Sequence, residues 1–272
     1  MKPSIMSLTY MQMPGATLDG MLAFARKAGI GGIDFVQPHE LAETPEEMCR
    51  RCAEAGVSAV GGIVFNSIGA ADFSRAKWLE EARRGIEATA ALGAGRVMFP
   101  TAGVCGRARG ESRKLWLELL SEAVSLGASC GVAVSIESFL MDMEWSPFVT
   151  SQDLLLATAA VPGLKVTFDS GNHFVVEDVL AAYRRLAPHV VNVHLKDWEI
   201  LDAPAEGALR MRDGRFYRMV PLGQGEVDNA ALMDLLLAEG RQYDFDLEVS
   251  GEEAVLQSWG YLKGRCFQRK AC

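Results

Sequence analysis

Residues 190–197 read VVNVHLKD, and this short stretch decides the fold. The run from Val190 to Val193 is mostly β-branched and carries no charge, which is typical of a strand buried on both faces of a parallel sheet. The residues that follow place His194, Lys196 and Asp197 where such a strand ends. The stretch therefore combines a buried parallel strand with a set of polar side chains at its carboxyl end.

The same combination recurs along the chain, where eight β-rich runs alternate with amphipathic helical segments. Dividing 272 residues by eight gives 34 residues per unit, a reasonable size for a βα repeat. We therefore predict an α/β protein with one closed (β/α)8 barrel, the TIM-barrel architecture, filling residues 1–272 as a single domain. A doubly wound open sheet is the alternative, and it is disfavoured because no G-x-G-x-x-G turn follows the first strand.

The boundaries of these units come from periodicity and from capping residues. We expect strands at Ser4–Leu8, Gly32–Val36, Ser58–Phe65, Arg96–Phe99, Val132–Glu137, Lys165–Asp169, Val190–Leu195 and Phe245–Val249. We expect helices between Thr17 and Gly29 and between Thr44 and Gly56, and then at Arg75–Leu92, Glu111–Ser129, Ser151–Ala160, Glu177–Leu186, Asn229–Ala238 and Glu253–Lys263.

Composition excludes several classes of protein. Hydrophobic residues make up 49% and charged residues 23% of the chain, as in ordinary globular proteins. No stretch approaches the roughly 18 uninterrupted apolar residues of a membrane-spanning helix. The net charge of -8 argues against a nucleic-acid partner, for which a basic surface is expected. Cys49 and Cys52 form a C-x-x-C within a predicted helix, but without a second pair a redox or zinc role is not favoured. Scattered cysteines and a poor signal peptide predict a cytoplasmic location.

Four consecutive strands each end in a side chain that can bind a metal, namely Glu137, Asp169, His194 and Glu248. In a barrel of this type, functional residues cluster at the carboxyl ends of the strands. Any one of these residues alone is better explained as a solvated, capping or core group, but four at successive strand ends favour a shared site. Three carboxylates and one imidazole suit a divalent cation such as Mn²⁺, Mg²⁺, Co²⁺ or Zn²⁺.

The runs SIESF, VTFDSGNHF, VNVHLKDW, PLGQGEVD and DLEVSGEE resemble the xylose-isomerase-like barrel superfamily. The sequence is most similar to its sugar phosphate isomerase/epimerase proteins, which share a domain with metal-dependent AP endonucleases. The resemblance implies that Glu137, Asp169, His194 and Glu248 hold one divalent metal, with manganese favoured. It also implies that Glu137 and Glu248 move a proton α to a carbonyl through a metal-stabilised enediolate.

Further candidate residues could contact a small sugar or keto-sugar substrate. Lys196 shares a strand face with His194, so it either binds substrate oxygen or pairs with a carboxylate. Asn172 stands where some epimerases carry a histidine, and His173 follows it, either pointing into the site or packing on a helix. Glu144 is a further candidate by loose similarity to those epimerases, as are the arginines of the loop after the seventh strand.

Two segments near the carboxyl ends of the strands have open interpretations. The connection Trp198–Asp228 is overlong and is either a functional lid or a solvated excursion. Gly223-x-Gly225 could let backbone amides approach a phosphate, although a plain turn is favoured.

Four functions compete. A sugar epimerase or isomerase is favoured, and the alternative is a lyase or dehydratase that eliminates from 3-keto-glycosides, including C-glycosides, or dehydrates a cyclic keto-polyol. A DNA repair nuclease is disfavoured because the chain has only four histidines and is acidic. A non-catalytic sugar-binding barrel remains, and the family resemblance leaves a homodimer or tetramer open.

Overall fold

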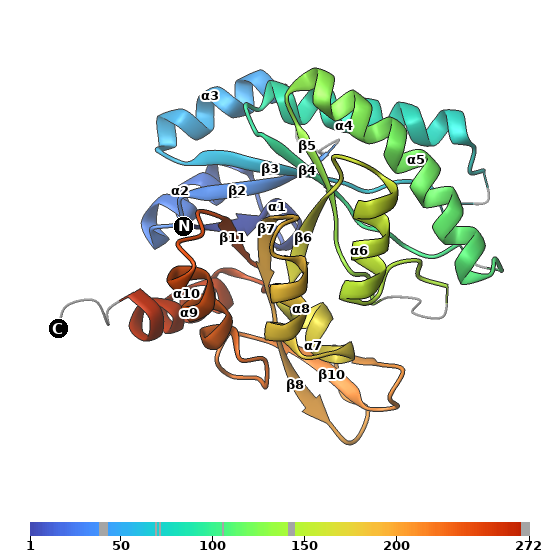
Figure 1. Cartoon of the computed structure of the whole chain (residues 1–272). Coiled ribbons are helices and arrows are strands. Elements are labelled where there is room, and N and C mark those ends of the chain that lie inside the picture. Colours follow the sequence, from blue (N-terminus) through green and yellow to red (C-terminus); the bar gives the residue numbers. More distant parts are fainter. Residues whose placement is uncertain (38–42, 69, 71, 105, 141–144, 268–272) are drawn as a thin grey trace.

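Eight parallel strands form a closed barrel in the computed structural model, which describes residues 1–37, 43–68, 70, 72–104, 106–140 and 145–267 (Figure 1). Around the barrel the order is β1-β11-β7-β6-β5-β4-β3-β2. Consecutive barrel strands therefore lie side by side, and strands β8–β10, which come between β7 and β11 in the sequence, form a separate sheet. This arrangement confirms the predicted (β/α)8 barrel. The barrel strands are β1 (Lys2–Met6), β2 (Gly32–Gln37), β3 (Ser58–Val64), β4 (Arg96–Phe99), β5 (Ala133–Ile136), β6 (Lys165–Asp169), β7 (Val190–Leu195) and β11 (Asp244–Leu247).

Helices surround the barrel, and several of them begin at a residue whose side chain caps the helix. The Thr17 hydroxyl accepts a hydrogen bond from the Gly20 backbone amide, and Thr44 does the same for Glu47. Gly29 and Gly56 each end a helix in the left-handed conformation, with φ angles of 73° and 70°. The helices are α1 (Ser7–Met11), α2 (Leu18–Ala28), α3 (Pro45–Ala55), α4 (Arg75–Ala91), α5 (Arg109–Cys130), α6 (Ser151–Ala160), α7 (Ser170–Val176), α8 (Val179–Leu186), α9 (Asn229–Ala238) and α10 (Glu252–Leu262), and a π-helical turn, η1, spans Lys263–Phe267.

Two short helices, α1 and α7, were not predicted from the sequence, and several other bounds differ by one or two residues. The first strand stops at Met6 rather than Leu8, because α1 begins at once and the Ser7 hydroxyl accepts a hydrogen bond from the Val36 amide. The short helix α7 follows β6 directly, with the Asp169 carboxylate accepting from the Asn172 amide as its cap. At Asp169 a polar side chain at a strand end captures a backbone amide of the next helical turn, which periodicity alone does not reveal, whereas Ser7 joins the start of α1 to the neighbouring strand β2.

The long connection after β7 is ordered as a second, smaller sheet. It holds β8 (Asp197–Leu201), β9 (Ala208–Arg210) and β10 (Phe216–Val220), paired antiparallel in the order β8-β10-β9. The sequence left a functional lid and a solvated excursion open here and did not predict these three strands. In Figure 1 this sheet projects from one end of the barrel. Buried Trp198 and Tyr217 meet edge to face, with ring centroids 6.3 Å apart, and anchor the sheet.

None of the helices in the described residues is long and apolar enough to cross a membrane.

Candidate metal centre

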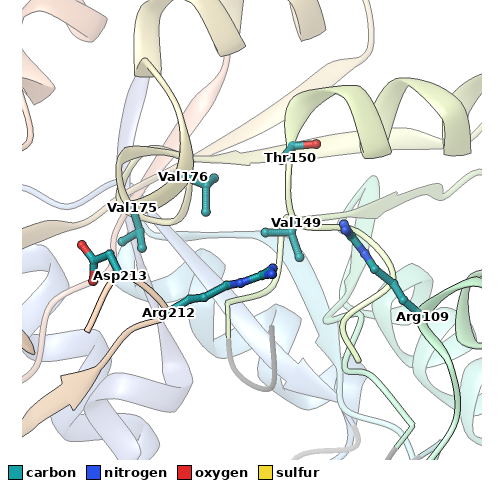
Figure 2. Close-up of a pocket in the computed structure, with 7 residues that line it drawn as sticks. All are labelled: Arg109, Val149, Thr150, Val175, Val176, Arg212 and Asp213. Atoms are coloured by element: carbon teal, nitrogen blue, oxygen red, sulfur yellow. The ribbon is translucent and has the colours of Figure 1, made fainter. Parts of the chain in front are cut away.

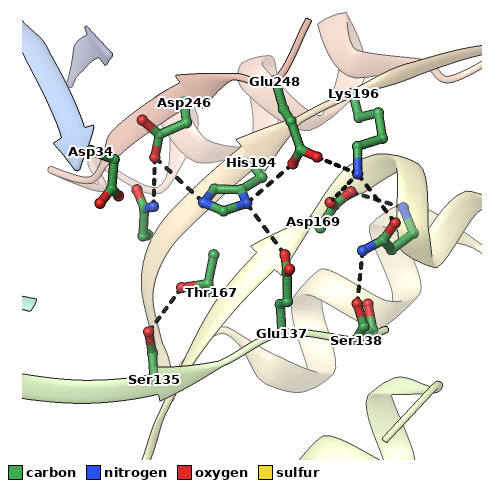
Figure 3. Close-up of polar contacts among 12 residues, drawn as sticks. Asp34, Ser135, Glu137, Ser138, Thr167, Asp169, His194, Lys196, Asp246 and Glu248 are labelled. Carbon is green, nitrogen blue, oxygen red and sulfur yellow. Dashed lines mark hydrogen bonds and ion pairs between the residues drawn. The ribbon is translucent and has the colours of Figure 1, made fainter. Parts of the chain in front are cut away.

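Four side chains meet at the carboxyl end of the barrel. Glu137 follows β5, Asp169 ends β6, His194 lies in β7 and Glu248 follows β11. One potential ligand atom from each residue lies within 4.8 Å of the other three (Figure 3). Strand register explains the convergence, since Asp169 pairs with His194, and His194 pairs with Asp246, two residues before Glu248. The structure thus brings together all four residues that the sequence proposed as metal ligands.

Lys196 sits at the edge of this cluster. Its Nζ atom lies 2.6 Å from Oε1 of Glu248 and 3.0 Å from Oδ2 of Asp169. The Asn172 side-chain oxygen lies 3.4 Å from the same ammonium, and its amide nitrogen donates to the backbone oxygen of Ser138 at 2.7 Å. Lys196 and Asn172, both proposed as substrate contacts, therefore lie directly beside the proposed metal ligands.

The cluster fits a divalent cation. His194 Nδ1 lies 3.3 Å from Oε2 of Glu137 and 3.3 Å from Oε2 of Glu248. This nitrogen and the Glu137 oxygen are buried and have no hydrogen-bond partner among the described residues, a costly state for polar atoms. In the deprotonated state that binds a metal, with His194 neutral, three carboxylates and the Lys196 ammonium leave two negative charges, which one divalent ion would balance. Oxygen donors with one imidazole suit Mn²⁺, Mg²⁺, Co²⁺ or Zn²⁺.

Burial and neighbouring charges shift the pKa values of the clustered residues in different directions. Burial raises the pKa of Asp169 to about 7, and nearby Lys196 only partly offsets this effect. Burial acts in the same direction on Glu248, but Lys196 and His194 outweigh it and lower the Glu248 pKa to about 2. Burial opposes the charged form of His194, yet Glu137 and Glu248 hold its pKa well above the usual value. Glu248 is therefore ionised at neutral pH, whereas Asp169 retains a proton more readily.

A second polar layer lies beneath the metal centre, inside the barrel. Arg96 Nη2 lies 2.9 Å from Oδ2 of Asp34 and 3.4 Å from Oδ2 of Asp246. The same Asp246 oxygen accepts a hydrogen bond from Asn192 at 2.7 Å and lies 3.5 Å from His194 Nε2. Sequence reasoning missed this layer. A signal was available, because Asn192 and Asp246 each precede a proposed ligand by two residues and so share its strand face.

The structure does not bring His173 to the site. Its ring stacks on Phe168, with centroids 4.6 Å apart, and its Nδ1 atom lies 2.9 Å from Oε1 of Glu177. Phe168 also contacts Tyr183 of α8, so this stack belongs to the interface between β6 and the helices. Of the two interpretations, helix packing is the one the structure supports. Glu144 lies outside the described residues.

The Gly223-x-Gly225 segment is a turn held by a carboxylate. Oδ2 of Asp197 accepts hydrogen bonds from the amides of Gly223 at 2.8 Å and Gly225 at 3.2 Å, and Oδ1 accepts from Val227 at 2.9 Å. These amides face Asp197 rather than an open site. The structure therefore agrees with the turn and offers no support for a phosphate site here.

A cavity of about 210 Å³ opens over the metal centre. Its polar lining in the described residues consists of Glu137, Asn172, Lys196 and Glu248, and its other lining side chains are apolar. The small sheet contributes part of that apolar wall through β8, β9 and β10.

A separate cavity of about 350 Å³ lies beside Arg109 and Arg212 (Figure 2). Its lining contains none of the proposed metal ligands, and Arg109 already pairs with Asp153. Arg212 comes from the long connection whose arginines were candidate substrate contacts. It lines this second cavity, and no arginine of that connection lines the cavity over the metal centre in the described part of the chain.

Fold and site together define a (β/α)8 barrel enzyme scaffold with a candidate metal centre at the carboxyl ends of its strands. A family model described as xylose isomerase-like TIM barrel matches residues 22–264, and the chain belongs to that family. This match confirms the resemblance stated from the motifs. No curated protein matches the chain in sequence.

Solved structures share the fold at low sequence identity. A probable 3-DHS dehydratase, AsbF from Bacillus anthracis, is 16% identical, with 97% of this chain and 100% of that chain covered and a TM-score of 0.80. An L-ribulose 3-epimerase is 18% identical, with 99% and 96% covered and a TM-score of 0.79. The IolI protein, described with a bound zinc atom, is 15% identical, with 100% of both chains covered and a TM-score of 0.78. Enzymes that isomerise and enzymes that eliminate water thus share this architecture.

Proposed function

We propose that the protein is a divalent-metal-dependent sugar epimerase or isomerase that moves a proton α to a carbonyl. The observation that carries this proposal is the convergence of Glu137, Asp169, His194 and Glu248 within 4.8 Å at the base of a cavity. Membership of the xylose isomerase-like family and the shared fold of an L-ribulose 3-epimerase support it.

These four residues would hold the metal, and manganese is the favoured ion. When bound, the ion supplies Lewis-acid polarisation of a substrate carbonyl and its neighbouring hydroxyl. Nδ1 of His194 and Oε2 of Glu137 are buried and make no hydrogen bond within the described part of the chain, which supports this assignment, as does the charge balance of the cluster. The zinc atom described for the IolI protein, which has the same fold, is consistent with a metal here.

The two glutamates would transfer the proton. One carboxylate takes the proton from the carbon next to the carbonyl, and the electron pair of that C–H bond moves toward the carbonyl oxygen to give an enediolate. In an epimerase the other carboxylate then delivers a proton to the opposite face of the same carbon. In an isomerase a proton is delivered to the former carbonyl carbon, and the hydroxyl proton passes to the former carbonyl oxygen as the new carbonyl forms. Lys196 and His194 keep Glu248 ionised, so this carboxylate is free to accept a proton, although its lowered pKa makes it a weak base until substrate binding changes these contacts.

Lys196 and Asn172 would orient the substrate. Both line the cavity, and both sit within hydrogen-bonding distance of the Asp169–Glu248 edge of the cluster. An ammonium at this position can also stabilise negative charge that develops on substrate oxygen.

A lyase or dehydratase on the same scaffold is the second candidate. It is favoured by the similarity in fold to a probable 3-DHS dehydratase, with 97% of this chain covered. It would use the same proton removal and then expel a leaving group from the adjacent carbon, acting on 3-keto-glycosides, including C-glycosides, or on a cyclic keto-polyol.

One experiment separates the two. Manganese-loaded protein is incubated in deuterated water with ketohexoses and, separately, with 3-keto-glycosides. Deuterium at the carbon next to the ketose carbonyl supports epimerisation or isomerisation. Elimination from the 3-keto-glycoside with no exchange into any ketose supports the lyase, and neither reaction in metal-loaded protein would refute both.

The chain would form one domain over residues 1–272, act in the cytoplasm, bind a small sugar or keto-sugar rather than nucleic acid or membrane, and associate with copies of itself.

A further inference from the structure

The cavity over the metal centre has two chemically different sides. Its polar residues all come from the β5, β6, β7 and β11 ends of the barrel. The opposite wall comes from the ends of β1, β3 and β4, where buried Met6, Ile63 and Met98 form an apolar cluster separate from the main core. Among the described residues that line it, the cavity therefore offers ligand atoms and hydrogen-bonding groups to one side of a bound molecule.

The small sheet extends the apolar surface over the cavity. Trp198 of β8, Leu209 of β9 and Met219 of β10 line it, and Met211 follows β9. The indole nitrogen of Trp198 donates to the Gly171 backbone oxygen at 3.0 Å, so it is already engaged. This wall therefore presents rings, methyl groups and thioethers, and its one strong side-chain donor is turned to the protein.

Two apolar side chains at the rim are unusually exposed. Phe65 retains 48% and Leu209 retains 39% of its accessible surface, although both line the cavity. Exposed apolar side chains that border a concave site mark contact surface for a ligand. They extend the wall outward from the buried methionines.

An unsubstituted sugar fits this arrangement poorly. Its hydroxyls surround the carbon chain, and those turned toward the apolar wall would lose water without gaining a hydrogen bond. A molecule with oxygen atoms at one end and an apolar group at the other would satisfy both sides.

We propose that the substrate carries a compact apolar substituent, such as one aromatic ring or a branched alkyl group, which packs on the wall formed by Met6, Ile63, Met98, Leu209 and Phe65. This inference rests on the proposed function for the reacting end, which lies at the metal centre. A volume of about 210 Å³ lies below the ~300–1,000 Å³ typical of ligand pockets, which favours a small substituent.

The test uses two α-hydroxyketones that differ only in this group, hydroxyacetone with a methyl group and 2-hydroxyacetophenone with a phenyl group. Both place a carbonyl beside a hydroxyl, so both can meet the metal centre in the same way. Isothermal titration calorimetry on the full, manganese-loaded chain measures the two dissociation constants. We expect the phenyl compound to bind at least about tenfold more tightly, as apolar pockets achieve for small increments in apolar size. Equal affinities would overturn the inference.

Substitutions at the rim locate the preference. Leu209→Ser and Phe65→Ser should each reduce the ratio of the two affinities about threefold or more, by loss of apolar contact. Leu256→Ser is the matched control, because Leu256 is 49% exposed and does not line the cavity. A phenyl preference that is the same in all three variants would show that this wall does not hold the ring.

The result is independent of turnover. Phenyl preference without deuterium exchange into either 2-hydroxyacetophenone or any ketose would retain this inference and remove the proposed epimerase function. Deuterium exchange without phenyl preference would support the proposed epimerase function and overturn this inference.

Discussion

The Nε2 atom of His194 lies 3.5 Å from Oδ2 of Asp246, on the opposite side of the ring from Glu137 and Glu248. Neighbouring strands impose this contact, because His194 of β7 and Asp246 of β11 are paired in register. A carboxylate beside one imidazole nitrogen holds that nitrogen protonated and leaves the other free to bind a metal. Asp246 is thus a positioning residue for the proposed metal centre.

Asp246→Asn should weaken manganese binding about 10- to 100-fold, the usual cost of losing a carboxylate behind a metal-bound histidine. Equilibrium dialysis of the metal-free protein measures the change. Asp244→Asn is the control, because Asp244 lies in the same strand and near Arg96 but makes no contact with His194. Unchanged affinity in folded Asp246→Asn protein would remove the positioning role.

Lys196→Gln should separate metal binding from turnover. The ammonium contacts Glu248 and Asp169, so its removal leaves the cluster more negative and should keep or increase manganese affinity. Turnover should fall about 10²- to 10⁴-fold, because charge on substrate oxygen and the ionised base both lose their cationic neighbour. Calorimetry and the deuterium-exchange assay give the two readouts. Loss of metal binding alongside activity would instead indicate a structural ion pair.

Stability of the metal-free protein should fall as the pH rises from about 4 to 7. Burial raises the pKa of Asp169 to about 7, and it does the same for Asp34, both from 3.8. A raised carboxyl pKa means that the folded state holds the proton more tightly than the unfolded state does. The resulting stabilisation of the fold is complete below the pKa of the unfolded chain and is lost as the pH rises through the pKa of the folded protein. The pKa of Glu248 is lowered from 4.5 to about 2, so titration of this residue changes the stability of the fold only below that upper value.

Thermal unfolding in the presence of a chelator measures this effect, with about 2–4 °C expected for each kcal/mol in a chain of this size. Asp169→Asn should flatten the profile, because the amide does not titrate. Manganese should raise the melting temperature more at pH 8 than at pH 5.5, since its ligands are then deprotonated. A metal-free melting temperature that rises through this pH range would contradict the burial argument.

The sequence was a good guide where a side chain and its strand end coincide. Glu137, Asp169, His194 and Glu248 each stand at the end of a strand, so parallel topology alone places them together. The small sheet was not foreseen because Ala208–Arg210 and Phe216–Val220 are short, carry arginines and gain their apolar contacts only from the folded barrel mouth.

The buried layer beneath the site was harder to foresee for a related reason. A lone Asp34 or Arg96 within a strand could face water or the barrel interior, and only barrel closure decides which, whereas Asp246 shares a strand face with Glu248. The position of His173 was hard to predict for the same reason, since its stacking on Phe168 depends on where α7 begins. Such contacts arise between elements distant in the sequence, and local pattern does not contain them.

Arg96→Met tests the energetic role of that layer. Removal of the guanidinium leaves Asp34 and Asp246 buried without their cation, which should cost about 3–5 kcal/mol of unfolding free energy. Arg75→Met is the matched control, because Arg75 pairs with Glu118 and Glu122 on the exposed surface and should contribute little. Urea unfolding of both variants gives the comparison. Similar losses in the two variants would show that the buried network is not a major source of stability.

Gly225→Ala tests the turn that ties the small sheet to the barrel. A Cβ atom at this position would lie 2.3 Å from Asp197 Oδ1 and 2.5 Å from the Trp198 backbone oxygen, too close for either to remain in place. We expect a loss of about 1–3 kcal/mol, as for other overpacked sites, and reduced turnover because Asp197 directly follows Lys196. Gly110→Ala is the control, since that glycine lies in the first turn of α5 with open space around it and alanine favours a helix there. Thermal unfolding measures the stability of both variants, and the deuterium-exchange assay measures their turnover. Wild-type values for Gly225→Ala would mean that the contact between Asp197 and the turn is dispensable for both stability and the site.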